Sequence, residues 1–203
     1  AHNLYRAIGE AADADMVIDS SKQAQDAALL HLVPGIDPFF LHLVRDPRAV
    51  AFSRSRNTED FRERGMASTG SFTSARNWLL ANVGAELVRR RNPGRCVIVR
   101  YEDFAAHPRE VVKRVVSMFG DAFAKMPFPD EQTVELAPRH TLKGNPSRFK
   151  TGRLVIRTDD EWKRRQSSLQ RAVVTGLTFP FLHRYGYPFR PRRSDRSMSS
   201  KDF

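Results

Sequence analysis

The sequence is poor in the features that mark secreted, membrane-spanning and disulfide-bonded proteins. It has one cysteine, Cys96, among its 203 residues, so no disulfide can form within the chain. No apolar run approaches the ~18 residues that suggest a membrane span, and the N-terminal residues lack the basic start and apolar core of a signal peptide. These absences predict a soluble protein of a reducing compartment, which we take to be the cytoplasm.

The charge of the chain is strongly unbalanced toward lysine and arginine. The formal net charge is +11, which favours an anionic partner and leaves nucleic acid, a membrane surface and nucleotide phosphates open. The length and the 40% hydrophobic content favour a single domain, which we predict over residues 1–189. Residues 190–203 are basic, serine-rich and almost without apolar side chains, and we expect a disordered tail there.

Short apolar runs alternate with helical patterns, which predicts an α/β fold with a parallel sheet. The expected strands are residues 16–18, 39–44 and 96–100, and the expected helices include residues 24–32, 74–91 and 108–119.

Two of the expected helices carry more specific patterns. In the helix at 74–91, Trp78, Leu79, Val83 and Leu87 have the spacing of an apolar face. A capping-box pattern at 158–161 predicts one helix running through Trp162, Leu169 and Val173. Residues 57–70 are expected to form a mobile loop or a short helix, and residues 121–139 are expected to be loop-rich. The glycine-punctuated segment 140–153 has the composition of a loop that covers a ligand.

The strongest chemical pattern begins at the end of the second expected strand. Arg45 follows the strand, Asp46 is placed to cap the next helix with Pro47 as its first residue, and Ser53 lies two turns further on. Arg45 and Ser53 can both reach one phosphate group, and the helix N-terminus adds free N–H donors at the edge where open α/β sheets bind ligands. The alternative is that Arg45 pairs with a nearby acid and that Ser53 faces solvent.

The segment 40–48, with Ser53 after it, closely resembles the 3′-phosphate-binding strand and helix of bacterial-type sulfotransferases that use 3′-phosphoadenosine 5′-phosphosulfate. The resemblance implies that Arg45 and Ser53 hold the nucleotide 3′-phosphate. It also implies a P-loop-NTPase-like three-layer sandwich, with no metal.

Two further segments resemble motifs of the same family in the same order. Residues 99–104 resemble its "YEDL" segment, which implies that Tyr101 lies near the adenine. The alternative is that Tyr101 packs in the core while Glu102 and Asp103 cap a helix. Residues 140–149 resemble the late loop that closes over the nucleotide, which implies 3′-phosphate contacts by the residues Lys143, Gly144 and Arg148.

Residues 16–22 resemble the family strand whose end faces the transferred sulfuryl group. The resemblance implies that Lys22 stabilises charge on the bridging oxygen and makes Asp19 a candidate acceptor-side group in an in-line transfer. A capped loop explains Asp19 and Ser20 equally well. The acceptor implied is a hydroxyl or amine of a carbohydrate or small molecule, bound by variable loops such as 57–70.

The glycine turn that cradles the 5′-phosphosulfate in this family has no counterpart before Asp19, where Gly9 is the only glycine. We therefore expect an N-terminally incomplete domain with an exposed sheet edge, inactive unless the missing segment is supplied. Two other interpretations stay open. One is a nucleic-acid-binding module, which the absence of interleaved basic and aromatic residues disfavours. The other is a non-catalytic remnant or half of a split protein, whose open edge pairs with another chain in an oligomer.

Overall fold

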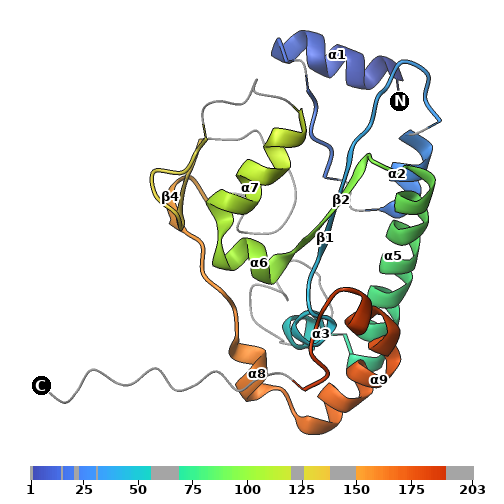
Figure 1. Ribbon diagram of the computed structural model, residues 1–203, viewed down its shortest axis with the longest axis vertical. Helices are drawn as coiled ribbons and strands as arrows, with labels where there is room; N and C mark the ends of the chain where they lie inside the picture. Colours follow the sequence, from blue (N-terminus) through green and yellow to red (C-terminus); the bar gives the residue numbers. More distant parts are fainter. Residues whose placement is uncertain are drawn as a thin grey trace, which may run out of the picture.

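The structure is a computed structural model that describes residues 2–14, 16–20, 23–30, 32–55, 69–119, 126–137 and 150–190 (Figure 1). The described elements, in chain order, are α1 (His2–Ala12), α2 (Ala24–Leu30), β1 (Phe40–Val44), α3 (Pro47–Ser55), α5 (Ser71–Arg91), β2 (Cys96–Arg100), α6 (Tyr101–Ala106), α7 (Pro108–Val116), the 3-10 turn η1 (Ser117–Phe119), β3 (Thr133–Leu136), β4 (Gly152–Val155), α8 (Glu161–Arg165) and α9 (Ser168–Arg184).

The centre of the fold is a parallel pair of strands. β1 pairs with β2 from Phe40 opposite Cys96 to Val44 opposite Arg100. Figure 1 shows α5 along one side of these strands and α6 and α7 on the other. The expected α/β class and the strands at 39–44 and 96–100 are thus confirmed as a mixed α/β arrangement around a short parallel sheet.

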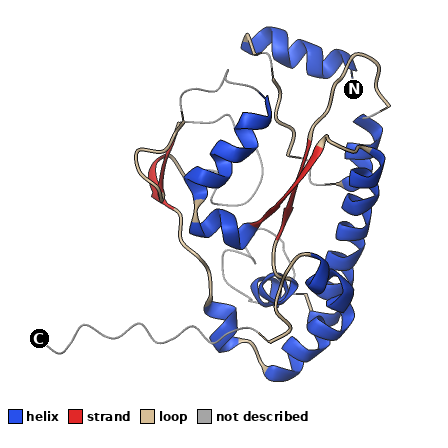
Figure 2. Ribbon diagram, viewed as in Figure 1, coloured by secondary structure: helices blue, strands red, loops and turns tan. Residues whose placement is uncertain are grey.

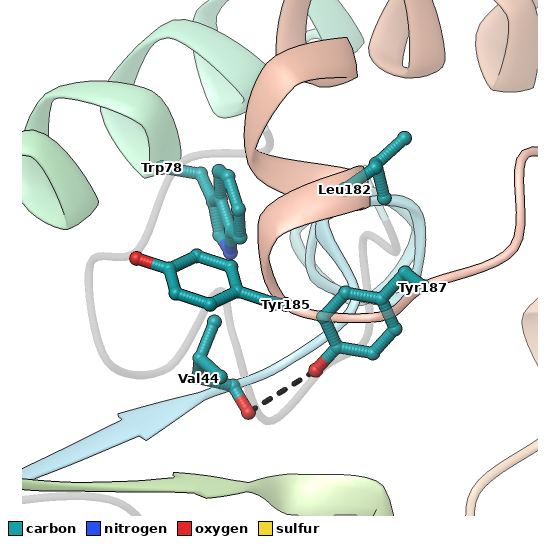
Figure 3. Close-up of a cluster of buried hydrophobic side chains, with 5 residues drawn as sticks. All are labelled: Val44, Trp78, Leu182, Tyr185 and Tyr187. Carbon is teal, nitrogen blue, oxygen red and sulfur yellow. Dashed lines mark hydrogen bonds between the residues drawn. The ribbon is translucent and has the colours of Figure 1, made fainter.

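The main hydrophobic core lies between β1, α5 and α9. Its buried members are Val44, Trp78, Leu182, Tyr185 and Tyr187 (Figure 3). The Trp78 ring packs edge-on against Tyr185, with centroids 6.1 Å apart. Aromatic side chains bring large apolar areas into such clusters, so this core fixes the end of α9 against the sheet.

α5 buries a face different from the one expected from its apolar residues. The buried residues include Trp78 but also Asn82 and Glu86, whereas Leu87 is exposed. The polar residues are tolerated inside because they have partners: the Asn82 amide oxygen lies 2.9 Å from His42 Nε2, and Glu86 forms an ion pair with Arg184. The predicted apolar face through Val83 and Leu87 is therefore wrong, because the hydrogen-bonded Asn82 and Glu86 are buried instead.

A second, small sheet lies apart from the parallel one (Figure 2). β3 and β4 pair antiparallel, with Thr133 opposite Val155 and Leu136 opposite Gly152. β3 lies within the segment 121–139, which was expected to be loop-rich, and β4 includes the end of the expected loop 140–153. Residues 56–68, 120–125 and 138–149 lie outside the described residues.

Two more expectations are corrected. Residues 16–18 form no strand, and Ile18 is 86% exposed, because no neighbouring strand pairs with this segment within the described chain.

The single helix expected through Trp162, Leu169 and Val173 is instead two helices, α8 and α9. The break is explained by Ser167, whose side-chain oxygen accepts from the Gln170 N–H and caps α9. Of the described helices, none combines the length and apolar character needed to span a bilayer.

Candidate functional site

The candidate site forms where the two parallel strands end. Val44 and Arg100 are paired, so the residues that follow them, Arg45 and Tyr101, emerge side by side. The guanidinium carbon of Arg45 lies 4.5 Å from the centroid of the Tyr101 ring. The structure therefore brings together the two residues that the sequence predicted for a phosphate and an adenine, at the edge where α/β sheets bind ligands.

The Arg45 side chain is only partly engaged by the described protein. Its Nη2 donates to Asp159 Oδ2 at 3.0 Å, and the two side chains are 24% and 37% exposed. Its Nε is buried and has no hydrogen-bond partner within the described residues. The Arg45 carbonyl accepts from Trp78 Nε1 at 3.0 Å, which ties the backbone of the site to the core. The pairing of Arg45 with an acid, one of the two alternatives, is thus observed.

The second arginine of the motif, Arg48, is fully committed to the fold. Its Nε and Nη2 donate to the two carboxylate oxygens of Asp46 at 2.9 and 2.7 Å, and its guanidinium also donates to the carbonyls of Pro188 and Phe189. Its side chain is 0% exposed. Of the two arginines, Arg45 is the one with donors left for a ligand.

The start of α3 is less open to an anion than the sequence suggested. Asp46 caps the helix as expected, since its Oδ1 accepts from the Arg48 N–H at 2.9 Å. That N–H is therefore not free, and a buried carboxylate stands at the helix N-terminus. Binding of an anion here would rest on Arg45 rather than on the first N–H groups of α3.

Glu102 joins the two strand ends, a role that the sequence did not reveal. Its Oε1 accepts from the Asp46 N–H at 2.9 Å, and its Oε2 lies 2.7 Å from the Tyr187 hydroxyl. It therefore does not serve as a local helix cap. Burial and the neighbouring Glu102 carboxylate raise the pKa of Tyr187, so this hydroxyl stays protonated and can donate. The same hydroxyl lies 3.3 Å from the Val44 carbonyl (Figure 3).

Ser53 and Asp19 both lie among the described residues. Ser53 is half-buried on α3 and makes no hydrogen bond to Arg45 or Tyr101 within the described chain. The Asp19 carboxylate accepts from the Tyr5 hydroxyl, and this hydrogen bond raises the pKa of Tyr5. In Figure 1 the segment 16–20 descends from α1 and ends above the level at which β1 leads into α3.

The remaining predicted site residues, Lys22, Lys143, Gly144 and Arg148, lie outside the described residues. The described part of the chain brings no three His, Cys, Asp or Glu side chains together as a metal site. Besides Glu102, the sequence did not single out Arg48 or Asp159 as residues of the site. Arg48 had a local signal, its spacing from Asp46, whereas Asp159 had none, because it lies 114 residues from Arg45.

The fold and the site define an α/β protein with an arginine and a tyrosine stacked at the carboxyl ends of parallel strands. A sequence model of the sulfotransferase family matches residues 22–125, just over half of the chain, and the chain belongs to this family. The match includes Arg45, Ser53 and Tyr101. No curated protein and no solved structure matches the chain.

Proposed function

We propose that this chain binds 3′-phosphoadenosine 5′-phosphosulfate, with the 3′-phosphate on Arg45 and the adenine beside Tyr101. Membership of the sulfotransferase family supports sulfuryl transfer as the chemistry. The observation that carries the more specific proposal is the Arg45–Tyr101 pair, a cation next to an aromatic face at 4.5 Å. Such a pair offers a charge for a phosphate and a surface for a base in one place.

The residues at the strand ends fit a phosphate group. A guanidinium presents a planar fork of donors that matches phosphate oxygens, and Arg45 keeps a buried Nε without a partner among the described residues. Because the Arg45 side chain is 24% exposed, a phosphate oxygen can reach the guanidinium from solvent. Ser53, Lys143, Gly144 and Arg148 complete the proposed phosphate contacts through the family resemblance.

The proposed reaction is an in-line transfer to a hydroxyl or amine of a carbohydrate or small-molecule acceptor. The acceptor atom attacks sulfur, the bond from sulfur to the 5′-phosphate oxygen breaks, and adenosine 3′,5′-bisphosphate leaves. A base takes the acceptor proton, and Lys22 offsets charge on the leaving oxygen. Asp19 is the candidate acceptor-side group. A P-loop-like three-layer fold and a cytoplasmic location belong to the same proposal.

Binding without transfer is the second candidate function. Its support is that the observed contacts at the strand ends, Arg45 with Tyr101 and with Asp159, concern the binding of a nucleotide and not the transfer step. Such a chain would retain adenosine 3′,5′-bisphosphate and release none from 3′-phosphoadenosine 5′-phosphosulfate when acceptors are offered.

Calorimetry with adenosine 3′,5′-bisphosphate tests the binding step. Arg45→Ala should weaken binding on the order of 10- to 100-fold, the loss of hydrogen bonds to a charged group. Adenosine 5′-monophosphate, which lacks the 3′-phosphate, should bind parent and variant alike. Arg90→Ala removes the same charge from an exposed position on α5 and should leave both affinities unchanged. Equal binding of the bisphosphate by the parent and by Arg45→Ala would contradict the proposal.

A further inference from the structure

Asp159 is the acid that faces the proposed phosphate-binding arginine. It lies in the irregular segment between β4 and α8, and its Oδ2 is 3.0 Å from Arg45 Nη2. Among the described residues, the one hydrogen bond to its other oxygen is long, 3.3 Å, from the Glu161 N–H. The carboxylate is thus held mainly by Arg45, and at 37% exposure it can turn toward water without leaving a buried charge.

The other carboxylates near the strand ends are already committed. Asp46 is buried in its bidentate pair with Arg48, and Glu102 holds the Asp46 N–H and the Tyr187 hydroxyl. Among the described acids, Asp159 is therefore the counterion of Arg45 that can move. An oxygen of its carboxylate now occupies a position on the guanidinium that a phosphate oxygen would take.

We propose that Asp159 is an intramolecular competitor for Arg45, which an incoming nucleotide 3′-phosphate must displace. The inference rests on the proposed function of Arg45. A phosphate dianion carries more charge than a carboxylate and can engage the guanidinium through two oxygens, whereas Asp159 uses one, so the phosphate wins the exchange. While the ion pair is formed, Arg45 is not available to a ligand. The apparent affinity of every ligand that uses Arg45 therefore falls as the fraction of molecules with the ion pair rises.

The opposite role would be that of a positioning residue. If Asp159 holds the guanidinium in the orientation that a phosphate needs, loss of its charge weakens binding. The two roles therefore predict changes of opposite sign in the affinity for the same ligand, and one substitution separates them.

Asp159→Asn is the matched substitution, because an asparagine keeps the shape and the acceptor for the Glu161 N–H while it removes the charge. By calorimetry, the variant should bind adenosine 3′,5′-bisphosphate about three- to fivefold more tightly than the parent, the range expected for a partly exposed ion pair. Adenosine 5′-monophosphate should bind both proteins alike. In the Arg45→Ala background the substitution should have no effect, since the competitor then has no target.

Asp160→Asn is the control for net charge. Asp160 is the next residue, similarly exposed, and pairs with Lys163 at 2.7 Å rather than with Arg45. It should leave the affinity unchanged. Unchanged or weaker binding by Asp159→Asn, or an equal gain in Asp160→Asn, overturns the inference while the proposed function stands. If neither the parent nor Asp159→Asn binds the bisphosphate, the proposed function fails and the inference fails with it.

Discussion

The two faces of β1 meet different surroundings. His42 and Val44 point to the side of α5 and α9, where Val44 joins the aromatic core and His42 pairs with Asn82. Leu43, on the other face, is 53% exposed, although its partner on β2, Val99, is only 3% exposed. The inner face is thus packed and hydrogen-bonded, while the outer face of β1 is open. The residues that hold the fold therefore lie on the α5 and α9 side.

The largest effect is expected from Arg48, which ties the chain after α9 to α3 on the inner side. Arg48→Ala leaves the buried Asp46 carboxylate unpaired and frees the carbonyls of Pro188 and Phe189. The free energy of unfolding should fall by about 3–5 kcal/mol. Urea unfolding measures the change.

A double variant keeps this prediction testable if the single variant does not fold. Asp46→Asn with Arg48→Met removes the unpaired charge, keeps a side chain that caps α3 and fills the arginine stem volume. It should recover much of the lost stability. No recovery would mean that the carbonyl contacts, rather than the ion pair, dominate.

Two leucines offer a matched comparison of the faces. Leu182 is 0% exposed in the inner core, so Leu182→Ala should lower the free energy of unfolding by about 2–5 kcal/mol. Leu43→Ala, on the outer face, should cost about 1 kcal/mol or less. Denaturant midpoints with unchanged slopes measure both. Equal losses would show that the outer face of β1 is covered in solution.

Local patterns in the sequence were enough to predict part of this structure. The apolar runs before Arg45 and Tyr101 predicted the two strands β1 and β2, and the Asp46–Pro47 pair predicted the start of α3. Because both strands belong to one parallel sheet, Arg45 and Tyr101 could be expected at the same edge of that sheet. Their direct contact depends on β1 and β2 being neighbours, which the sequence did not predict. The predicted features depend on neighbours in sequence or on one general rule of sheet topology.

The features that could not be predicted depend on partners far along the chain. The buried face of α5 contains Glu86, which an apolar pattern assigns to solvent, and it is buried because Arg184 reaches it from α9. Asp159 likewise meets Arg45 only after the chain has folded. Two charged side chains can be buried on the face of a helix where hydrophobic periodicity predicts apolar residues, because each charge offsets the cost of burying the other.

A smaller effect than those of Arg48 and Leu182 is expected from Glu86, and it depends on pH. Burial opposes ionisation of this carboxyl, but hydrogen bonds from Arg184 and Arg89 outweigh burial and lower its pKa to about 2. Since the folded pKa is below that of the unfolded chain, the stabilisation, on the order of 2 kcal/mol, is present above about pH 4.5 and is lost as the pH falls toward 2.

Glu86→Gln should therefore be less stable than the parent at pH 6. The difference between their free energies of unfolding, measured in urea, should narrow between pH 5 and pH 3. Glu131→Gln makes the same change of charge in an exposed pair with Arg109, and it should change the free energy of unfolding little at any pH in this range. A gap that stays constant with pH would mean that Glu86 stabilises the fold through packing and neutral hydrogen bonds, and that the inner side of the sheet does not depend on its charge.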